Sequence, residues 1–238
     1  MQSWVAVLGL LATIVFGALP LWLEGKDDGD RDEFTVLKLS AGQSREIDTR
    51  KTDEATGRRF TSKERATVLY LYLSNNTDDL KVFQGLKVTT RRFIQVTDCT
   101  VDVGGSVQIT EGYDIDLPRP GKSTHKSILY QLPPRQAEGI SITLGTSTQE
   151  TGVFDLEVSL QSRTGYLSAG RVIALSHPEL KRLYPRDLEK LPLQDFPNAS
   201  CVRRLDQTLS DFISQHDSVP PEVRTLQEGV HTTAEQLG

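Results

Sequence analysis

The chain has 238 residues with 27 basic and 32 acidic side chains, which gives a formal net charge of −5. No stretch carries the excess of lysine and arginine that is typical of nucleic-acid binding, so nucleic acid is disfavoured as a partner. Two cysteines are too few for a disulfide framework, and the four histidines are too scattered to predict a metal site.

The first 23 residues predict a membrane anchor. From Trp4 to Leu23 there are 20 residues and no charged side chain, and a helix of that length spans about 30 Å, the hydrocarbon thickness of a lipid bilayer. Trp4 and Trp22 stand at the two ends, where indole rings favour the membrane interfaces. A cleaved secretory signal is the alternative, but the segment lacks a basic start and is too long. We therefore expect a retained single-pass anchor over residues 1–23.

Three small residues of the anchor, Gly9, Thr13 and Gly17, recur every four positions and share one helix face. This spacing lets two helix backbones approach closely, which is compatible with a homo-oligomer. The alternative is that small residues are simply common in membrane helices.

An acidic linker, residues 24–33, follows the anchor and contains two basic side chains, Lys26 and Arg31. Because orientation follows lysine and arginine near a membrane span, these two residues favour a cytoplasmic domain, with an exported domain as the alternative. The orientation also determines whether the two cysteines are oxidised or reduced. Cys99 and Cys201 can pair in an exported domain, whereas cytosolic thiols stay reduced.

Residues 34–176 predict a mainly β domain. Short segments rich in Val, Ile, Leu, Tyr and Phe alternate with turn residues and show no helical period, which indicates an antiparallel β-sandwich. Leu69, Leu71 and Leu73 alternate with larger or more polar side chains and should face the core. The predicted strands are 34–39, 68–73, 92–99, 100–103, 107–110, 127–132, 140–144, 153–160 and 171–175.

Residues 49–66 contain six basic and three acidic side chains and almost nothing apolar. The pattern predicts a long exposed loop or a frayed hairpin. It is the first candidate contact for an acidic partner or for lipid headgroups, and a solvated loop without a role is the alternative. Further along, hydrophobic register predicts a hairpin over 101–109 in which a three-residue loop pairs Val103 with Val107.

Several chemical sites were sought in the same domain. The carboxylates of Asp98, Asp102, Glu111, Asp114 and Asp116 are weak calcium candidates, because calcium prefers oxygen ligands but no spacing rule supports the group. The sequence shows no catalytic constellation and no cofactor motif, so we expect neither an enzyme nor a bound cofactor.

Two short motifs in the chain match the pattern of N-glycosylation sites. The triplets that begin at Asn75 and Asn198 match the glycosylation acceptor pattern, which matters only in a secretory context.

Residues 177–238 predict a helical region. Ser176, Pro178 and Glu179 form a helix-start signal, and apolar residues at helical spacing predict further helices over 199–215 and 221–237. Helices of this length are marginal in water on their own, so we expect them to dock against the β domain or the neighbouring helix rather than to form a coiled coil.

Together these features predict a membrane-anchored, non-enzymatic module that binds a protein partner or supports an assembly at the membrane surface. One alternative is a carbohydrate-binding or hydrolytic surface domain that uses the acids between residues 98 and 116. Another is a membrane stalk or sensor that self-associates through its anchor.

Overall fold

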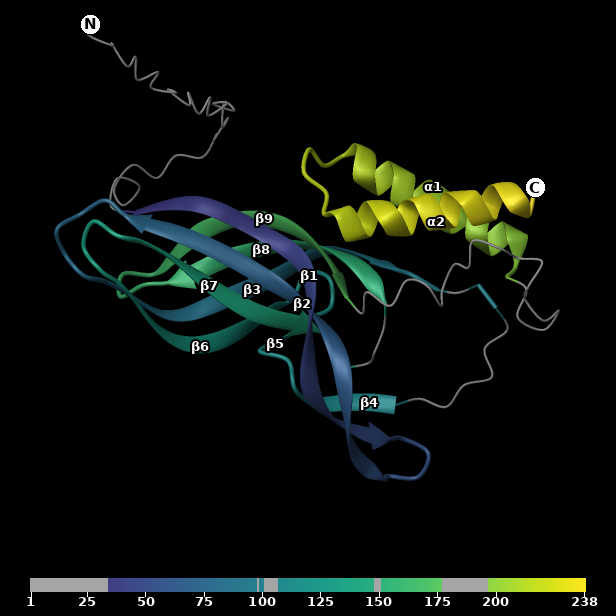
Figure 1. The fold of residues 1–238 in the computed structure, drawn as a ribbon, viewed down its shortest axis with the longest axis horizontal. Helices are drawn as coiled ribbons and strands as arrows, with labels where there is room; N and C mark the ends of the chain where they lie inside the picture. The colour runs from purple at the N-terminus through teal and green to yellow at the C-terminus, as the bar shows by residue number, and fades with distance from the viewer. Residues whose placement is uncertain (1–33, 98, 101–106, 148–150, 177–196) are drawn as a thin grey trace, which may run out of the picture.

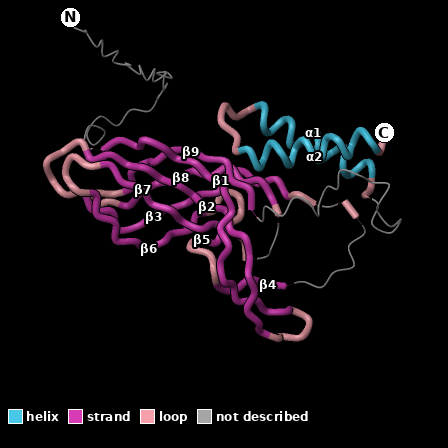
Figure 2. Tube along the Cα trace, in the orientation of Figure 1, coloured by secondary structure: helices cyan, strands magenta, loops and turns pink. Residues whose placement is uncertain are grey.

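The computed structural model describes residues 34–97, 99–100, 107–147, 151–176 and 197–238. In these residues the protein is mainly β, with two sheets followed by two carboxyl-terminal helices (Figure 1, Figure 2). The predicted anchor and linker, residues 1–33, lie outside the described residues. Within the described ranges no helix is both long and apolar enough to cross a membrane.

Sheet A has the strand order β4-β1-β2-β7-β5, and sheet B has the order β6-β3-β8-β9. The strands are β1 Phe34–Asp53, β2 Arg59–Asn75, β3 Lys81–Gln95, β4 Val107–Glu111, β5 Ile115–Asp116, β6 Ser123–Leu132, β7 Ala137–Gly145, β8 Gly152–Gln161 and β9 Tyr166–Ser176. The described pairs are antiparallel except for β5 and β7, which run parallel.

The parallel pair corrects the expectation of a wholly antiparallel arrangement. Side-chain hydrogen bonds hold the short strand β5 beside β7: Asp114 accepts the backbone N–H of Thr143 at 2.9 Å, and Asp116 accepts that of Ser147 at 2.8 Å. These contacts join residues about thirty positions apart in the chain, so periodicity does not reveal them.

The main hydrophobic core lies between the two sheets. Sheet A contributes Leu69, Leu71 and Leu73, each fully buried as predicted, and sheet B contributes a matching row on β8 that includes Leu156 and Leu160. Side chains alternate between the two faces of a strand, so one face of each sheet is covered by the other. Burial of this apolar area is the main stabilising contribution to the body of the protein.

Two amphipathic helices pack on sheet B, α1 (Ala199–Ser214) and α2 (Pro221–Gln236). Their apolar stripes form a second core with the outward-facing side chains of β8 and β9, for example Val153, Ile173 and Leu175. The prediction that the helices dock on the β domain is therefore confirmed. A disulfide joins Cys99, which follows β3, to Cys201 in the first turn of α1, with a Cα–Cα distance of 5.7 Å.

Of the two alternatives predicted for residues 49–66, a long exposed loop or a frayed hairpin, the structure shows a hairpin, the distal part of the paired strands β1 and β2. The structure corrects two other element boundaries. Strand β3 begins at Lys81 rather than Arg92, because bulges between Phe83 and Gly85 and between Thr90 and Arg92 interrupt the period-two alternation that sequence patterns detect. Ser176 ends β9, and its hydroxyl donates a hydrogen bond to the carbonyl of the first β8 residue instead of capping a helix.

Two other predicted elements fall on undescribed residues. The helix expected after Ser176 falls in residues 177–196. The hairpin over 101–109 is described only from Val107, where β4 pairs with the end of β1.

Candidate interaction surfaces

The most distinctive surface is the β1–β2 hairpin where it extends beyond the body, residues 45–66, which we call the arm (Figure 1). None of its residues belongs to either hydrophobic core of the described chain. Its turn is closed by the carbonyl of Asp53, which accepts the N–H of Gly57 at 2.7 Å, and Gly57 has the positive φ of +67° that this turn requires. Strand β4 adds a third strand on the β1 side.

Charged side chains, rather than apolar ones, line the arm. Lys51 Nζ lies 2.5 Å from Glu64 Oε1, and Lys63 Nζ lies 2.8 Å from Asp48 Oδ1, so opposite charges face each other across the two strands. The hydrogen bond with Asp48 raises the pKa of Lys63. Hydrogen bonding from the Thr56 backbone N–H lowers the pKa of Asp53. Cross-strand pairs of this kind stabilise a hairpin modestly.

The tip of the arm is basic and carries one aromatic ring. Arg58 and Arg59 are exposed and form no ion pair with any residue in the described part of the chain, and Phe60 beside them is 40% exposed. Arginine and aromatic side chains are the types most enriched at the centres of protein interfaces. The arm tip can therefore pair with carboxylates and cover an apolar group at the same time.

A second surface is a groove of about 420 Å³ between the outer face of sheet A and the start of α2. Tyr72 forms part of its floor. Its ring packs on the bare backbone of Gly139, where an added side-chain carbon would lie 2.7 Å from Tyr72 Cε1. The ring is 43% exposed. The groove is lined by Lys38, Ser40, Ala41, Gly42, Tyr70, Tyr72, Pro221 and Glu222.

The groove combines tyrosine rings with one basic and one acidic side chain, which suits a short polar segment better than an apolar ligand. The sequence analysis did not predict this groove. Tyr70 and Tyr72 alternate with the core leucines, and this pattern could have predicted it because it places both rings on the outer face of one strand.

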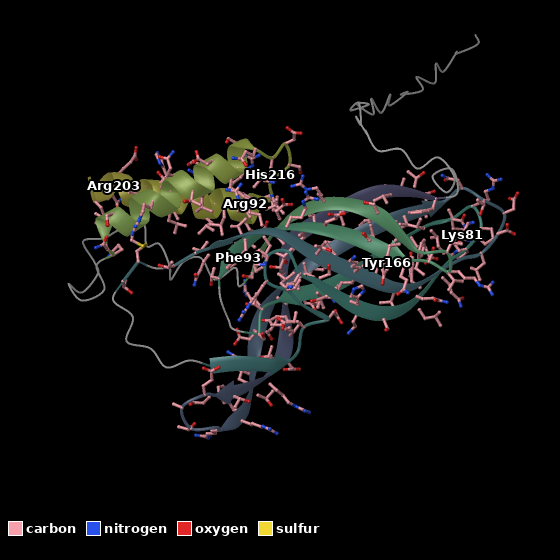
Figure 3. All side chains as sticks on the ribbon, turned by 180° about the vertical axis from the view of Figure 1, so that it is seen from behind. Lys81, Arg92, Phe93, Tyr166, Arg203 and His216 are labelled. Atoms are coloured by element: carbon pink, nitrogen blue, oxygen red, sulfur yellow. A yellow bond between two sulfur atoms is a disulfide. The ribbon has the colours of Figure 1, made fainter. Side chains whose placement is uncertain are left out.

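Beneath α1 lies a polar cluster that fixes the helix on sheet B. Asp155 is buried and accepts hydrogen bonds from Arg171, with Arg171 Nε at 3.3 Å from Asp155 Oδ1, and His216 Nε2 lies 3.7 Å from the same carboxylate. Arg92 lies over the Phe212 ring at 5.3 Å (Figure 3). Because these groups contact one another, the cluster positions the end of α1 rather than an open site.

The acids proposed for calcium are only partly described. Asp98 and Asp102 fall outside the described residues. Burial raises the pKa of Asp114, but the hydrogen bonds from Thr143 outweigh it, so the net pKa lies below the usual value. Both Asp114 and Asp116 use carboxylate oxygens to hold β5 on β7. Among the described residues no group of three potential ligands could hold a metal ion.

The anchor candidates, Trp4, Trp22, Gly9, Thr13 and Gly17, all lie outside the described residues.

The two glycosylation motifs have structural explanations. The side chain of Asn75 is buried and donates to the carbonyls of Asp79 and Leu132. Asn198 caps α1 by accepting the backbone N–H of Cys201 at 3.0 Å.

Comparisons of the chain with protein-family models, curated proteins and solved structures found no match. The chemistry of the surfaces themselves therefore has to support any functional conclusion.

Proposed function

We propose that this protein is a membrane-anchored, non-enzymatic interaction module that presents its arm to an acidic segment of a partner protein. The observation that carries the proposal is the arm itself, a paired hairpin outside both hydrophobic cores. Ordering each backbone residue costs about 1–2 kcal/mol, and only Thr49 and Ala66 of the arm are buried. The arm, even with β4 beside it, therefore adds little to core stability.

The geometry of β1 supports a role for the arm at a distance from the membrane. This strand is 20 residues long and runs from Phe34, directly after the linker, to Asp53 at the arm turn. At about 3.3 Å per residue it reaches roughly 60 Å when straight. The arm projects from the part of the sheets that lies away from the start of β1 (Figure 1).

The arm tip supports an acidic partner. Arg59 and Arg58 are exposed and form no ion pair within 4 Å among the described residues, although Arg58 interacts electrostatically with Asp53. Guanidinium groups bind carboxylates in a bidentate manner. Phe60 offers an apolar contact next to these two charges. The proposed interface is therefore small, charge-steered and sensitive to salt.

The disulfide supports the exported alternative for the domain. Both cysteines of the chain are joined, and disulfides persist mainly in oxidising compartments. A disulfide is stronger evidence for the compartment than the two basic residues of the linker, Lys26 and Arg31, which favour the cytoplasm. We accordingly propose that residues 34–238 lie outside the cytoplasm. Trapping thiols in intact cells tests this, because a cytoplasmic domain would show both cysteines reduced.

The partner is tested with a photo-crosslinking amino acid at Phe60 in the full-length protein in its native membrane. We expect one discrete adduct at this position and none at Gln95, an exposed β3 residue in the body. The double variant Arg58→Glu, Arg59→Glu should abolish the adduct. A matched double variant on the helices, Arg204→Glu with Arg224→Glu, changes the net charge equally and should leave it intact.

If both double variants lose the crosslinked adduct equally, the net charge of the protein rather than the arm governs binding. An adduct that survives reversal of Arg58 and Arg59 would exclude the basic tip as the contact, and no adduct from any arm position would exclude the arm.

A further inference from the structure

Three exposed leucine side chains of the described residues lie near one end of the domain. They are Leu37 of β1, Leu80 just before β3 and Leu129 of β6, and we call them the apolar ring; Leu129 is the most exposed at 75%. The other exposed large apolar side chains of the described residues lie elsewhere: Phe60 at the arm tip, Tyr72 in the groove beside α2, and Tyr166 against Lys87 and His125 farther along sheet B. Single exposed apolar residues are ordinary, but three leucines from separate elements near one end offer one apolar contact surface.

Strand topology explains why these three residues lie at the same end. At this end β1 and β3 begin and β2 and β6 end. Each ring residue lies within three positions of one of these strand ends, a distance of about 10 Å along a strand. Figure 3 shows Lys81, which follows Leu80 in the chain, at the end away from the helices.

Charge at this end is balanced. The turns here carry Asp78, Asp79, Arg135 and Arg163, and Arg135 Nε lies 2.9 Å from Asp78 Oδ1. A surface with paired charges and exposed leucines matches the boundary between lipid headgroups and acyl chains. It lacks the basic excess that binding to anionic lipids requires.

We propose that the apolar ring rests on the lipid bilayer, so that the domain stands end-on with its arm directed away from the membrane. This inference rests on the anchor of the proposed function. The linker between Leu23 and Phe34 has ten residues, which reach at most about 36 Å. Phe34 begins β1 at the same end as the ring. The anchor therefore brings this end, rather than the arm, to the bilayer.

The test uses the full-length protein in phosphatidylcholine nanodiscs that contain a lipid with a headgroup-level nitroxide quencher. An environment-sensitive fluorophore is attached to one added cysteine in each of four variants, with the native disulfide left oxidised. Leu80→Cys and Leu129→Cys report on the ring, Phe60→Cys is the matched exposed control at the arm tip, and Ala12→Cys reports on the anchor.

We expect quenching at both ring positions at least about twofold stronger than at Phe60, as for side chains at the interface. The difference should persist at high salt, because the contact is apolar. Ring quenching equal to that of Phe60, with Ala12 quenched, would overturn this inference and leave the anchor in place. Absence of quenching at Ala12 would overturn the anchor and the inference together.

Two further outcomes separate lipid from protein contact. Fluorophores on the ring that are shielded from water but not quenched by lipid would mean that a second copy or another protein covers the ring, which overturns the proposal. In the Leu129→Glu background, quenching at Leu80→Cys should fall at least about twofold, since burying a charge at the interface is unfavourable. Phe60→Glu is the matched control and should not change it.

Discussion

The two halves of strand β2 are held in place by different forces. In the body half, Leu69, Leu71 and Leu73 are fully buried against sheet B. In the arm half, exposed charges take their place, and Lys63 faces Asp48 across the strands. Both halves are continuous in backbone hydrogen bonding with β1. Backbone pairing alone therefore extends a strand beyond the core, while side-chain burial supplies the stability of the body.

The largest expected difference between the two halves of β2 is in the free energy of unfolding that is lost when a side chain is truncated. Leu71→Ala should lower the free energy of unfolding by about 2–5 kcal/mol, because it leaves a cavity in a closed core. Thr61→Ala, on an exposed arm position of the same strand, should change it by about 0.5 kcal/mol or less. Urea unfolding of the two full-length variants measures both values, and equal losses would mean that the arm belongs to the cooperative core.

The helical pair, unlike the arm, is tied to the body by a covalent bond. The disulfide between Cys99 and Cys201 closes a separation of 102 residues. Its removal in the double variant Cys99→Ser, Cys201→Ser should cost about 2–4 kcal/mol, chiefly because the unfolded chain gains freedom. Chemical denaturation of the oxidised wild type and the variant gives the difference. Reduction of the wild type is the control, and an unchanged midpoint would mean that the bond adds nothing to the docking.

Within the arm, the more buried ion pair should matter more than the exposed one. The side chains of Lys51 and Glu64 are only 11% and 21% exposed, whereas that of Lys63 is 61% exposed. Lys51→Ala should destabilise the arm by about 0.5–1 kcal/mol, and Lys63→Ala should have a smaller effect. Hydrogen exchange should accelerate in residues 45–66 and remain slow in residues 67–75. Acceleration in both halves would contradict separate stabilisation.

The smallest expected effect is a pH dependence in the helical pair. The hydrogen bond from His231 to Asp206, 3.0 Å long, raises the pKa of His231 above its usual 6.5. The stabilisation is fully present below pH 6.5 and is lost as pH rises through the raised pKa. His231→Gln should remove this slope from unfolding measured between pH 5 and pH 9 (roughly the titration range of histidine), and an identical slope in the variant would assign it to another group.

Local patterns were enough to predict the buried leucines and the two helices. Leu69, Leu71 and Leu73 show period two, and the α1 stripe of Val202, Leu205 and similar residues shows the helical period, so neighbours in the chain carry the signal. The same patterns left two alternatives for the arm, a loop or a frayed hairpin, because a charged strand has no apolar alternation. They placed the start of β3 wrongly, because bulges at Phe83 and Thr90 interrupt the alternation of that strand.

The sequence by itself thus determined which side chains must be buried, because hydrophobic periodicity is a local property of the chain. Only the tertiary structure decided which distant residues meet. It paired the arm strands, placed Cys99 beside Cys201, and brought Leu37 of β1, Leu80 just before β3 and Leu129 of β6 to one end. The physical reason is that strand order and sheet packing set these contacts, and neither is encoded in the spacing of neighbouring residues.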